Sequence, residues 1–264
     1  MNLDFTEKNA LVSMILTYEM FAVPLAAFFA AVLSGLGGFG GAFLLIIVLT
    51  PIVGVKAVIP LISVFAACNN LSRVFIYRKE IVWRTAIYFT LASLPGVYFG
   101  AKLLEWMSES LLLLILGLIL IFAIPLGRKL KKTDFRSGNK TIFAFGAIYG
   151  LVSGAAAGTG MLVVAGLNSA GLRGAVLLGT DAIIGFFNGA MRASVYSFLG
   201  LLTPTMIGYA LLMGLLTLPG NWVASKIVRK MGDNLHSKFL EVLIGAGGVW
   251  FIYKSLRDFW IYLI

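Results

Sequence analysis

Charged residues are scarce in this sequence, and their scarcity excludes a water-soluble domain. Of the 264 residues only 12% are charged, whereas 60% are hydrophobic. A soluble domain carries about 25% charged residues. Apolar runs of about 20 residues recur along the chain, and that length spans a bilayer as a helix. The short alternating segments of transmembrane β-strands are absent. The composition therefore predicts an all-α integral membrane protein.

Cysteine and histidine are also nearly absent, which limits redox and metal chemistry. Cys68 is the single cysteine, so an internal disulfide is excluded. His236 is the single histidine and lies in a basic stretch, where we expect it to be solvated. The sequence contains neither an HExxH motif nor a cysteine cluster. We therefore expect no metal site and no cofactor.

Acidic residues are few, and the basic residues that outnumber them gather in short loops. Lys and Arg together number 21, against 11 Asp and Glu. Cytoplasmic loops of membrane proteins are enriched in Lys and Arg, so this charge indicates topology and not nucleic-acid binding. The N-terminal residues lack the basic region of a cleavable signal peptide, so we expect the first helix to direct insertion.

The densest basic stretch divides the chain into two halves. It covers residues 128–140 and is typical of a cytoplasmic linker. The first transmembrane repeat covers residues 1–127, and the second covers residues 141–264.

The two halves share a register. An offset of 119 residues aligns 34–77 with 153–196 without a gap, and the matches are glycines and polar residues. Pro95-Gly96 matches Pro219-Gly220 with a slightly larger offset. The polar pairs are Ser34 with Ser153, Asn69 with Asn188, Arg73 with Arg192, and Tyr77 with Tyr196.

Equivalent loops of the halves differ in charge, which predicts inverted repeats. The loop 78–84 is basic and is assigned to the inside, whereas its counterpart 197–205 is uncharged. The turn 105–109 is acidic, whereas its counterpart holds Arg229, Lys230 and Lys238. Inverted repeats require an odd number of crossings per half. Five crossings, or three with a re-entrant hairpin, satisfy this, so we expect about 8–10 membrane segments with glycine-broken or re-entrant helices.

Each half keeps one arginine inside an apolar segment, in the pattern Asn-x-x-x-Arg-x-x-x-Tyr. This spacing places the three residues on one helix face. An arginine at mid-depth costs at least about 2.5 kcal/mol unless it is paired or solvated. Its planar guanidinium matches oxyanions, so Arg73 and Arg192 are candidates for anion binding. Snorkelling toward the cytoplasmic interface is the alternative for Arg73. We expect Asn69 and Asn188 to donate hydrogen bonds, and Tyr77 and Tyr196 to line the path.

Two glycine-rich stretches interrupt the apolar segments, at 34–41 and 153–160. Glycine costs about 1 kcal/mol relative to alanine inside a helix, so both stretches predict breaks. A broken helix exposes backbone N–H groups that attract anions, and paired breaks in two halves are typical of a transporter site. Close helix packing through small residues is the alternative. The candidate ligands here are Ser34, Gly37, Gly38, Ser153, Gly158 and Thr159.

Asp181 is an acidic residue inside an apolar segment of the second half. Its counterpart in the first half is Ile62. It lies nearly three turns before Arg192 and on roughly the same face. We expect it either to join an ion-pair network or to carry a coupling proton.

The glycine stretches resemble those of the TauE/SafE sulfite-exporter family of membrane permeases. Leu94-Pro95-Gly96 and Leu218-Pro219-Gly220 look like a later helix signature of that family, and alanines at 155–157 depart from its usual form. The resemblance implies a secondary transporter, and by its family name an exporter, of sulfite or an organosulfonate in a bacterial inner membrane. It implies a small anion and the lipid bilayer as partners, with homo-oligomerisation left open.

Three other functions stay open at the level of sequence. An uncoupled anion channel shares this architecture. An intramembrane serine protease would need a membrane-embedded histidine to activate Ser153, and the sequence places none there. A scaffold or receptor would not need arginines in both halves. We therefore expect a transporter and not an enzyme.

Overall fold

The chain folds entirely into helices over the part that the computed structural model describes. Described are residues 22–42, 44, 45, 48, 49, 55–103, 139–155 and 159–263, with 114, 117, 118, 121, 122 and 125. After a first helix, Ala22–Gly37, come α3 (Val55–Tyr77), α4 (Trp83–Leu103), α6 (Asn139–Ala155), α7 (Gly160–Ser169), α8 (Gly174–Phe198), α9 (Pro204–Leu215), α10 (Thr217–Lys230) and α11 (Asp233–Leu263).

Within the described residues, four helical stretches are long and apolar enough to cross a membrane. They are Ala57–Tyr77, Gly174–Phe198, Pro204–Lys230 and Asp233–Arg257. Large hydrophobic side chains cover the outside of the bundle; Phe75, Phe99 and Val249, for example, are each 61% exposed. Such a surface is unfavourable in water and suits lipid. The predicted all-α membrane class is confirmed, whereas the number of 8–10 segments stays a prediction.

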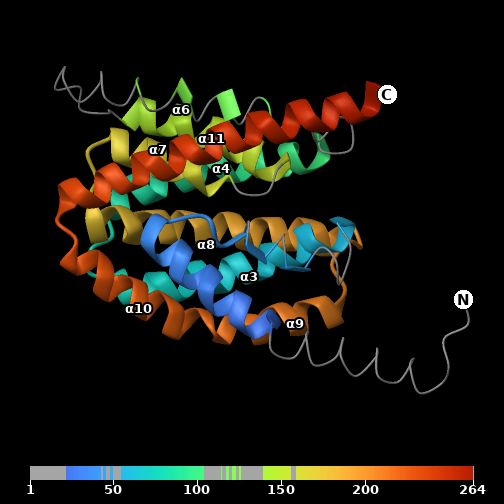
Figure 1. Ribbon diagram of the computed structural model, residues 1–264, viewed down its shortest axis with the longest axis horizontal. Coiled ribbons are helices and arrows are strands. Elements are labelled where there is room, and N and C mark those ends of the chain that lie inside the picture. The colour runs from blue at the N-terminus through green and yellow to red at the C-terminus, as the bar shows by residue number, and fades with distance from the viewer. Residues whose placement is uncertain are drawn as a thin grey trace, which may run out of the picture.

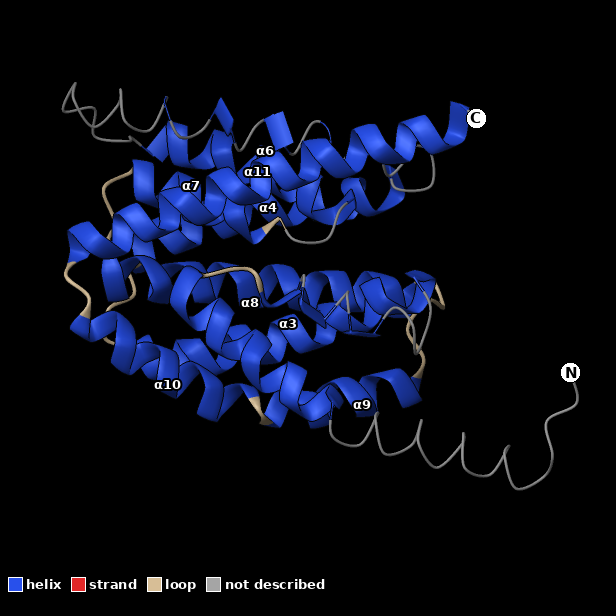
Figure 2. Cartoon of the chain, in the orientation of Figure 1, coloured by secondary structure: helices blue, strands red, loops and turns tan. Residues whose placement is uncertain are grey.

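The helices lie in two layers, and each layer mixes the two halves of the sequence. Figure 1 shows α4, α6, α7 and α11 in one layer, and α3, α8, α9, α10 and the blue first helix in the other. Contacts join α4 to α6, and α3 to α8, α9 and α10. Helices of the first half thus pack mainly on helices of the second half. Figure 2 shows the short loops that join them at the ends of the bundle.

Helix α8 is central because it contacts both layers. It packs against α3 and α10 on one side and against α4, α6, α7 and α11 on the other. Its buried face includes Asp181 and Asn188, and the partly buried Arg192 follows one turn later. Polar residues on this helix are therefore held in the interior of the bundle by surrounding apolar side chains.

Helices α4 and α6 approach so closely that only glycine fits between them. A Cβ added at Gly150 would lie 2.0 Å from the carbonyl oxygen of Ser93, and one added at Gly100 would lie 2.0 Å from that of Leu151. Glycines four residues apart, such as Gly96 and Gly100, form a flat helix face that permits this approach in membranes.

The position of His236 differs from what its sequence context suggests. His236 was expected to be solvated, and this is wrong: it is fully buried in the first turn of α11. Its Nε2 lies 2.9 Å from the carbonyl oxygen of Leu36, near the end of the first helix. Helix α11 begins at Asp233, within the basic stretch of the sequence. His236 therefore packs against the first glycine stretch although its sequence neighbours are polar.

The α4–α6 contact gives a direct test of the fold. Gly150→Ala should lower the unfolding temperature, because its methyl group must displace the α4 backbone, and overpacking costs about 1–3 kcal/mol. Gly208→Ala on α9 is the control, since nothing lies within 4 Å of its added Cβ. Alanine there should be neutral or stabilise by up to about 1 kcal/mol. Thermal unfolding of both variants in detergent measures the difference, and equal unfolding temperatures would contradict this packing.

Candidate anion site

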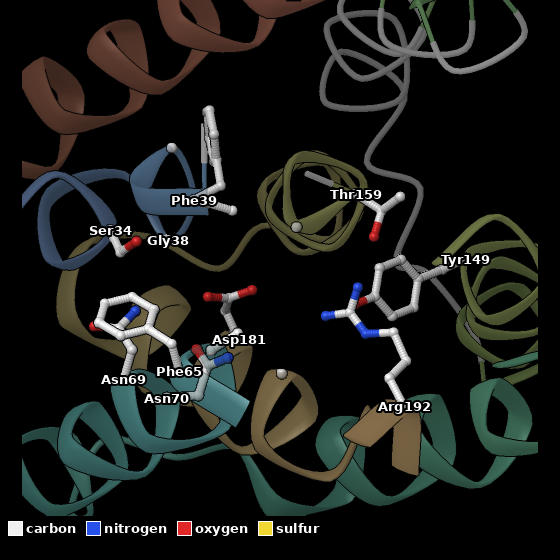
Figure 3. Close-up of a pocket in the computed structure, with 15 residues that line it drawn as sticks. Ser34, Gly38, Phe39, Phe65, Asn69, Asn70, Tyr149, Thr159, Asp181 and Arg192 are labelled. Carbon is white, nitrogen blue, oxygen red and sulfur yellow. The ribbon is translucent and has the colours of Figure 1, made fainter. Parts of the chain in front are cut away.

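A small polar cavity of about 70 Å³ lies between the two glycine stretches and helices α3, α6 and α8. One water molecule needs roughly 10–15 Å³ by a comparable measure, so several waters or one small anion can occupy it. Figure 3 shows Arg192, Tyr149 and Thr159 on one side of it, and Asp181, Asn70 and Ser34 on the other. The described lining residues are Ser34, Gly38, Phe39, Gly40, Ala42, Phe65, Ala66, Asn69, Asn70, Tyr149, Thr159, Gly160, Asp181, Gly185 and Arg192.

The first glycine stretch breaks the helix at the cavity. The first helix ends at Gly37, and helical structure resumes at Gly41. Between them Gly38 and Gly40 adopt φ values of 81° and 101°, a left-handed conformation that glycine alone adopts readily. The Ser34 hydroxyl accepts a hydrogen bond from the Gly41 N–H at 3.1 Å, which satisfies one backbone donor of the break. The predicted break in this stretch is confirmed.

The second glycine stretch also separates two helices. Helix α6 ends at Ala155 and α7 begins at Gly160, with Thr159 as the residue before it. Gly158, a predicted ligand, lies outside the described residues. The two breaks are neighbours in space, since a Cβ added at Gly160 would lie 3.3 Å from the Phe39 Cβ. The cavity therefore forms where both halves interrupt their helices.

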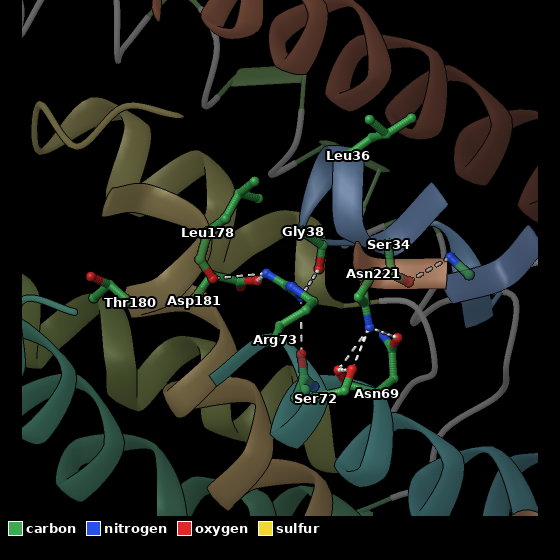
Figure 4. A network of polar contacts seen from close by, with 12 residues as sticks. Ser34, Leu36, Gly38, Asn69, Ser72, Arg73, Leu178, Thr180, Asp181 and Asn221 are labelled. Carbon is green, nitrogen blue, oxygen red and sulfur yellow. Dashed lines mark hydrogen bonds and ion pairs between the residues drawn. The ribbon is translucent and has the colours of Figure 1, made fainter. Parts of the chain in front are cut away.

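Arg73 lies behind the cavity wall and is fully buried. Its Nη2 forms an ion pair with Asp181 at 2.5 Å and also donates to the Leu178 carbonyl. Its Nη1 donates to the Gly38 carbonyl at 3.2 Å (Figure 4) and to Asn70 Oδ1 at 3.0 Å. Snorkelling is therefore wrong for Arg73, and Asp181 has joined an ion pair with the arginine of the opposite half.

Arg192, the counterpart of Arg73, has a different environment. It lines the cavity, and its Nη1 donates one long hydrogen bond, 3.4 Å, to the Ser153 carbonyl. Its Nε has no partner among the described residues. No described carboxylate lies within ion-pairing distance of it, so its positive charge is left uncompensated in this part of the structure.

Asn69 is fixed by a residue that the sequence did not single out. The Asn221 side chain donates from Nδ2 to Asn69 Oδ1 at 2.8 Å and to Ser72 Oγ at 2.5 Å (Figure 4). Asn221 directly follows the Pro219-Gly220 signature, and this position is the only sequence feature that could have pointed to it. The network ties α10 to α3 and orients one wall of the cavity.

Six of the predicted site residues line the cavity and six described ones do not. The Asn188 amide, which does not line the cavity, donates hydrogen bonds to Ser93 Oγ and to the Ile184 carbonyl. Tyr149 lines the cavity but was not predicted from the sequence. Its counterpart in the first half is Ala30, so the repeat alignment did not single it out. The lining set contains Ser34, Gly38, Asn69, Thr159, Asp181 and Arg192, while Gly37, Arg73, Ser153, Asn188, Tyr77 and Tyr196 lie outside it.

Comparison with known families identifies the chain. The family model described as sulfite exporter TauE/SafE matches residues 23–251. The chain belongs to the TauE/SafE family. Comparison with curated proteins and with solved structures gave no significant match. Because the family is one of exporters, the chain is a membrane transport protein. The polar cavity between its two helix breaks lies inside this transport protein.

The Arg73–Asp181 pair predicts strong coupling in stability. Asp181→Leu alone or Arg73→Met alone leaves one buried charge without its partner, which costs about 3–5 kcal/mol. The double variant removes both charges and should be less destabilised than either single variant. Chemical unfolding of the purified proteins measures this cycle. Arg229→Met and Glu80→Leu remove an exposed pair as a control and should each cost less than about 1 kcal/mol. Additive losses at Arg73 and Asp181 would contradict the buried pair.

Proposed function

We propose that this protein exports a small sulfur-containing anion, sulfite or an organosulfonate, across a bacterial inner membrane, and that the cavity is its binding site. The uncompensated guanidinium of Arg192 is the observation that carries the proposal. A guanidinium held in a cavity with few acceptors favours an anionic ligand, because the ligand would supply the missing charge and hydrogen-bond acceptors.

The groups around Arg192 suit an oxyanion. Thr159 is buried in the cavity wall beside Tyr149, where its hydroxyl can donate to a ligand oxygen. Helix α7 begins at Gly160 in the cavity wall, and the first N–H groups of a helix carry partial positive charge. Asn69 and Asn70 add amide groups on the opposite wall. Several donors around one cation are the arrangement that sulfite and sulfonate oxygens require.

The remaining predicted residues support the site without lining it. Arg73 holds Asp181 and the Gly38 carbonyl in place, and Ser153 accepts the hydrogen bond of Arg192. Tyr77 and Tyr196 are buried within the two hydrophobic cores. In this proposal they fix the walls between which the anion binds. The coupling role of Asp181 stays a prediction.

We further propose that the halves are inverted repeats related by a pseudo-two-fold axis through the cavity. Two equivalent glycine contacts support this. A Cβ added at Gly96 would meet the Leu151 nitrogen, at 2.6 Å, and the Ala147 oxygen; one added at Gly220 would meet the Phe28 oxygen, at 2.7 Å, and the Val32 nitrogen. The offset of 119 pairs Phe28 with Ala147 and Val32 with Leu151, so aligned glycines meet aligned backbone positions in the opposite half.

The positions of two loops agree with inversion. Residues 78–82 lie near the start of α8, where the Val82 N–H donates to Thr180 Oγ1. Their counterparts, residues 197–201, lie at the other end of α8. A 25-residue helix is about 37 Å long, so equivalent loops lie at opposite ends of the bundle.

Transport of sulfite into or out of proteoliposomes tests the function. Arg192→Gln should lower the flux by about tenfold to a hundredfold, because it removes charge-assisted hydrogen bonds that contribute about 1.5–3 kcal/mol each. Arg229→Gln is the matched control, since this arginine is exposed and pairs with Glu80 at the end of the bundle. Its flux should equal that of the wild type. Unchanged flux in Arg192→Gln would refute the site, and no anion flux in the wild type would refute the function.

A further inference from the structure

Three ionised side chains determine the charge of the cavity among the described residues. Arg192 and Asp181 line it. Arg73 does not line it but binds three groups that do, the Gly38 carbonyl, Asn70 Oδ1 and Asp181 Oδ2. Arg73 is therefore separated from the cavity by a single layer of atoms, close enough for its charge to act there.

The charges do not cancel. Asp181 forms an ion pair with Arg73, and both side chains are almost fully buried. Arg192 has no such partner among the described residues. The sum is one net positive charge, to which the start of α7 adds only a partial charge.

We propose that Asp181 determines the valence of the transported anion: by neutralising Arg73 it leaves one positive charge, so the site selects monoanions over dianions. This inference rests on the proposed function and deepens it. A monoanion balances Arg192. A dianion would bring a second negative charge beside the Asp181 carboxylate, in a buried place where water screens poorly.

The asymmetry of the halves supports this assignment. The repeat supplies an arginine to each half, and two free guanidinium groups would favour a divalent ligand. Asp181 aligns with Ile62, so only one of the two arginines receives a carboxylate partner. The Asp181 side chain is in this view a specificity-determining residue, and Arg73 is the positioning residue that holds it.

The test compares two anions whose charges are fixed near neutral pH, methanesulfonate and sulfate, because sulfite itself changes its charge in that range. Proteoliposome fluxes are measured with the membrane potential clamped at zero. Asp181→Asn frees the charge of Arg73, so the ratio of sulfate to methanesulfonate flux should rise at least about tenfold. The control Glu80→Gln removes a partly exposed carboxylate that pairs with Arg229 and should leave the ratio unchanged.

A charge-restoring variant separates valence from structural damage. Arg73→Gln combined with Asp181→Asn leaves Arg192 alone and should return the ratio to that of the wild type. Each ratio compares two anions on one protein, so a lower yield does not alter it. An unchanged ratio in Asp181→Asn, or a sulfate preference in the double variant, would overturn the inference.

A single variant carries the test if Asp181→Asn does not fold. Arg73→Gln leaves Asp181 against Arg192 with no surplus charge, so methanesulfonate flux should fall at least about tenfold relative to that of the zwitterion taurine. An unchanged ratio would again overturn the inference. Failure of the wild type to carry any of these anions or sulfite would refute the transporter proposal itself, which is a different result.

Discussion

The buried ion pair between Arg73 and Asp181 is the interaction on which the rest of the interior depends. It joins α3 of the first half to α8 of the second, and through the Gly38 carbonyl it also holds the first helix break. Removing two charges from water costs several kcal/mol per ion, so such a pair is rarely kept for stability alone. Here it ties the two central helices together and places a neutralised pair of charges at the cavity wall.

The second constraint is that the two helix breaks lie next to each other at the cavity. Glycine residues make this arrangement possible. Left-handed backbone at Gly38 and Gly40 interrupts the first helix, and the α6–α7 interruption lies against Phe39. The close contact between α4 and α6 extends to Gly154, next to the second break. Once the breaks are adjacent, a side chain from α8 can reach both: Arg192 bonds the Ser153 carbonyl and faces the cavity. The site is thus a consequence of packing between halves and not of any one local motif.

Sequence patterns predicted the helical class and the first break, because length, hydropathy and glycine act locally. The repeat register also located Arg73 and Arg192, since a charged residue in lipid is costly wherever it lies. It could not predict their partners. Asp181 lies near Arg192 in sequence but pairs with Arg73, because the end of α3 packs beside the start of α8. Tertiary contacts of this kind leave no signal in one sequence.

The missed residues have the same explanation. Tyr149 lines the cavity, whereas Asn221 orients the lining residue Asn69, and neither has a polar counterpart in the other half. His236 was misplaced because basic neighbours suggested a loop, whereas α11 begins at Asp233 and buries this side chain against Leu36. Local charge is a poor guide to burial where a helix begins at the end of a bundle.

The proposed binding of a small oxyanion between Arg192 and the two helix breaks can be observed directly. Its most direct test is a structure of the protein with selenite, a heavier analogue of sulfite whose selenium is located by anomalous scattering. We expect a selenium peak in the cavity, with oxygens in hydrogen-bond contact with the Arg192 guanidinium and the Thr159 hydroxyl. A peak beside the exposed basic loops, with the cavity empty of selenium, would contradict it.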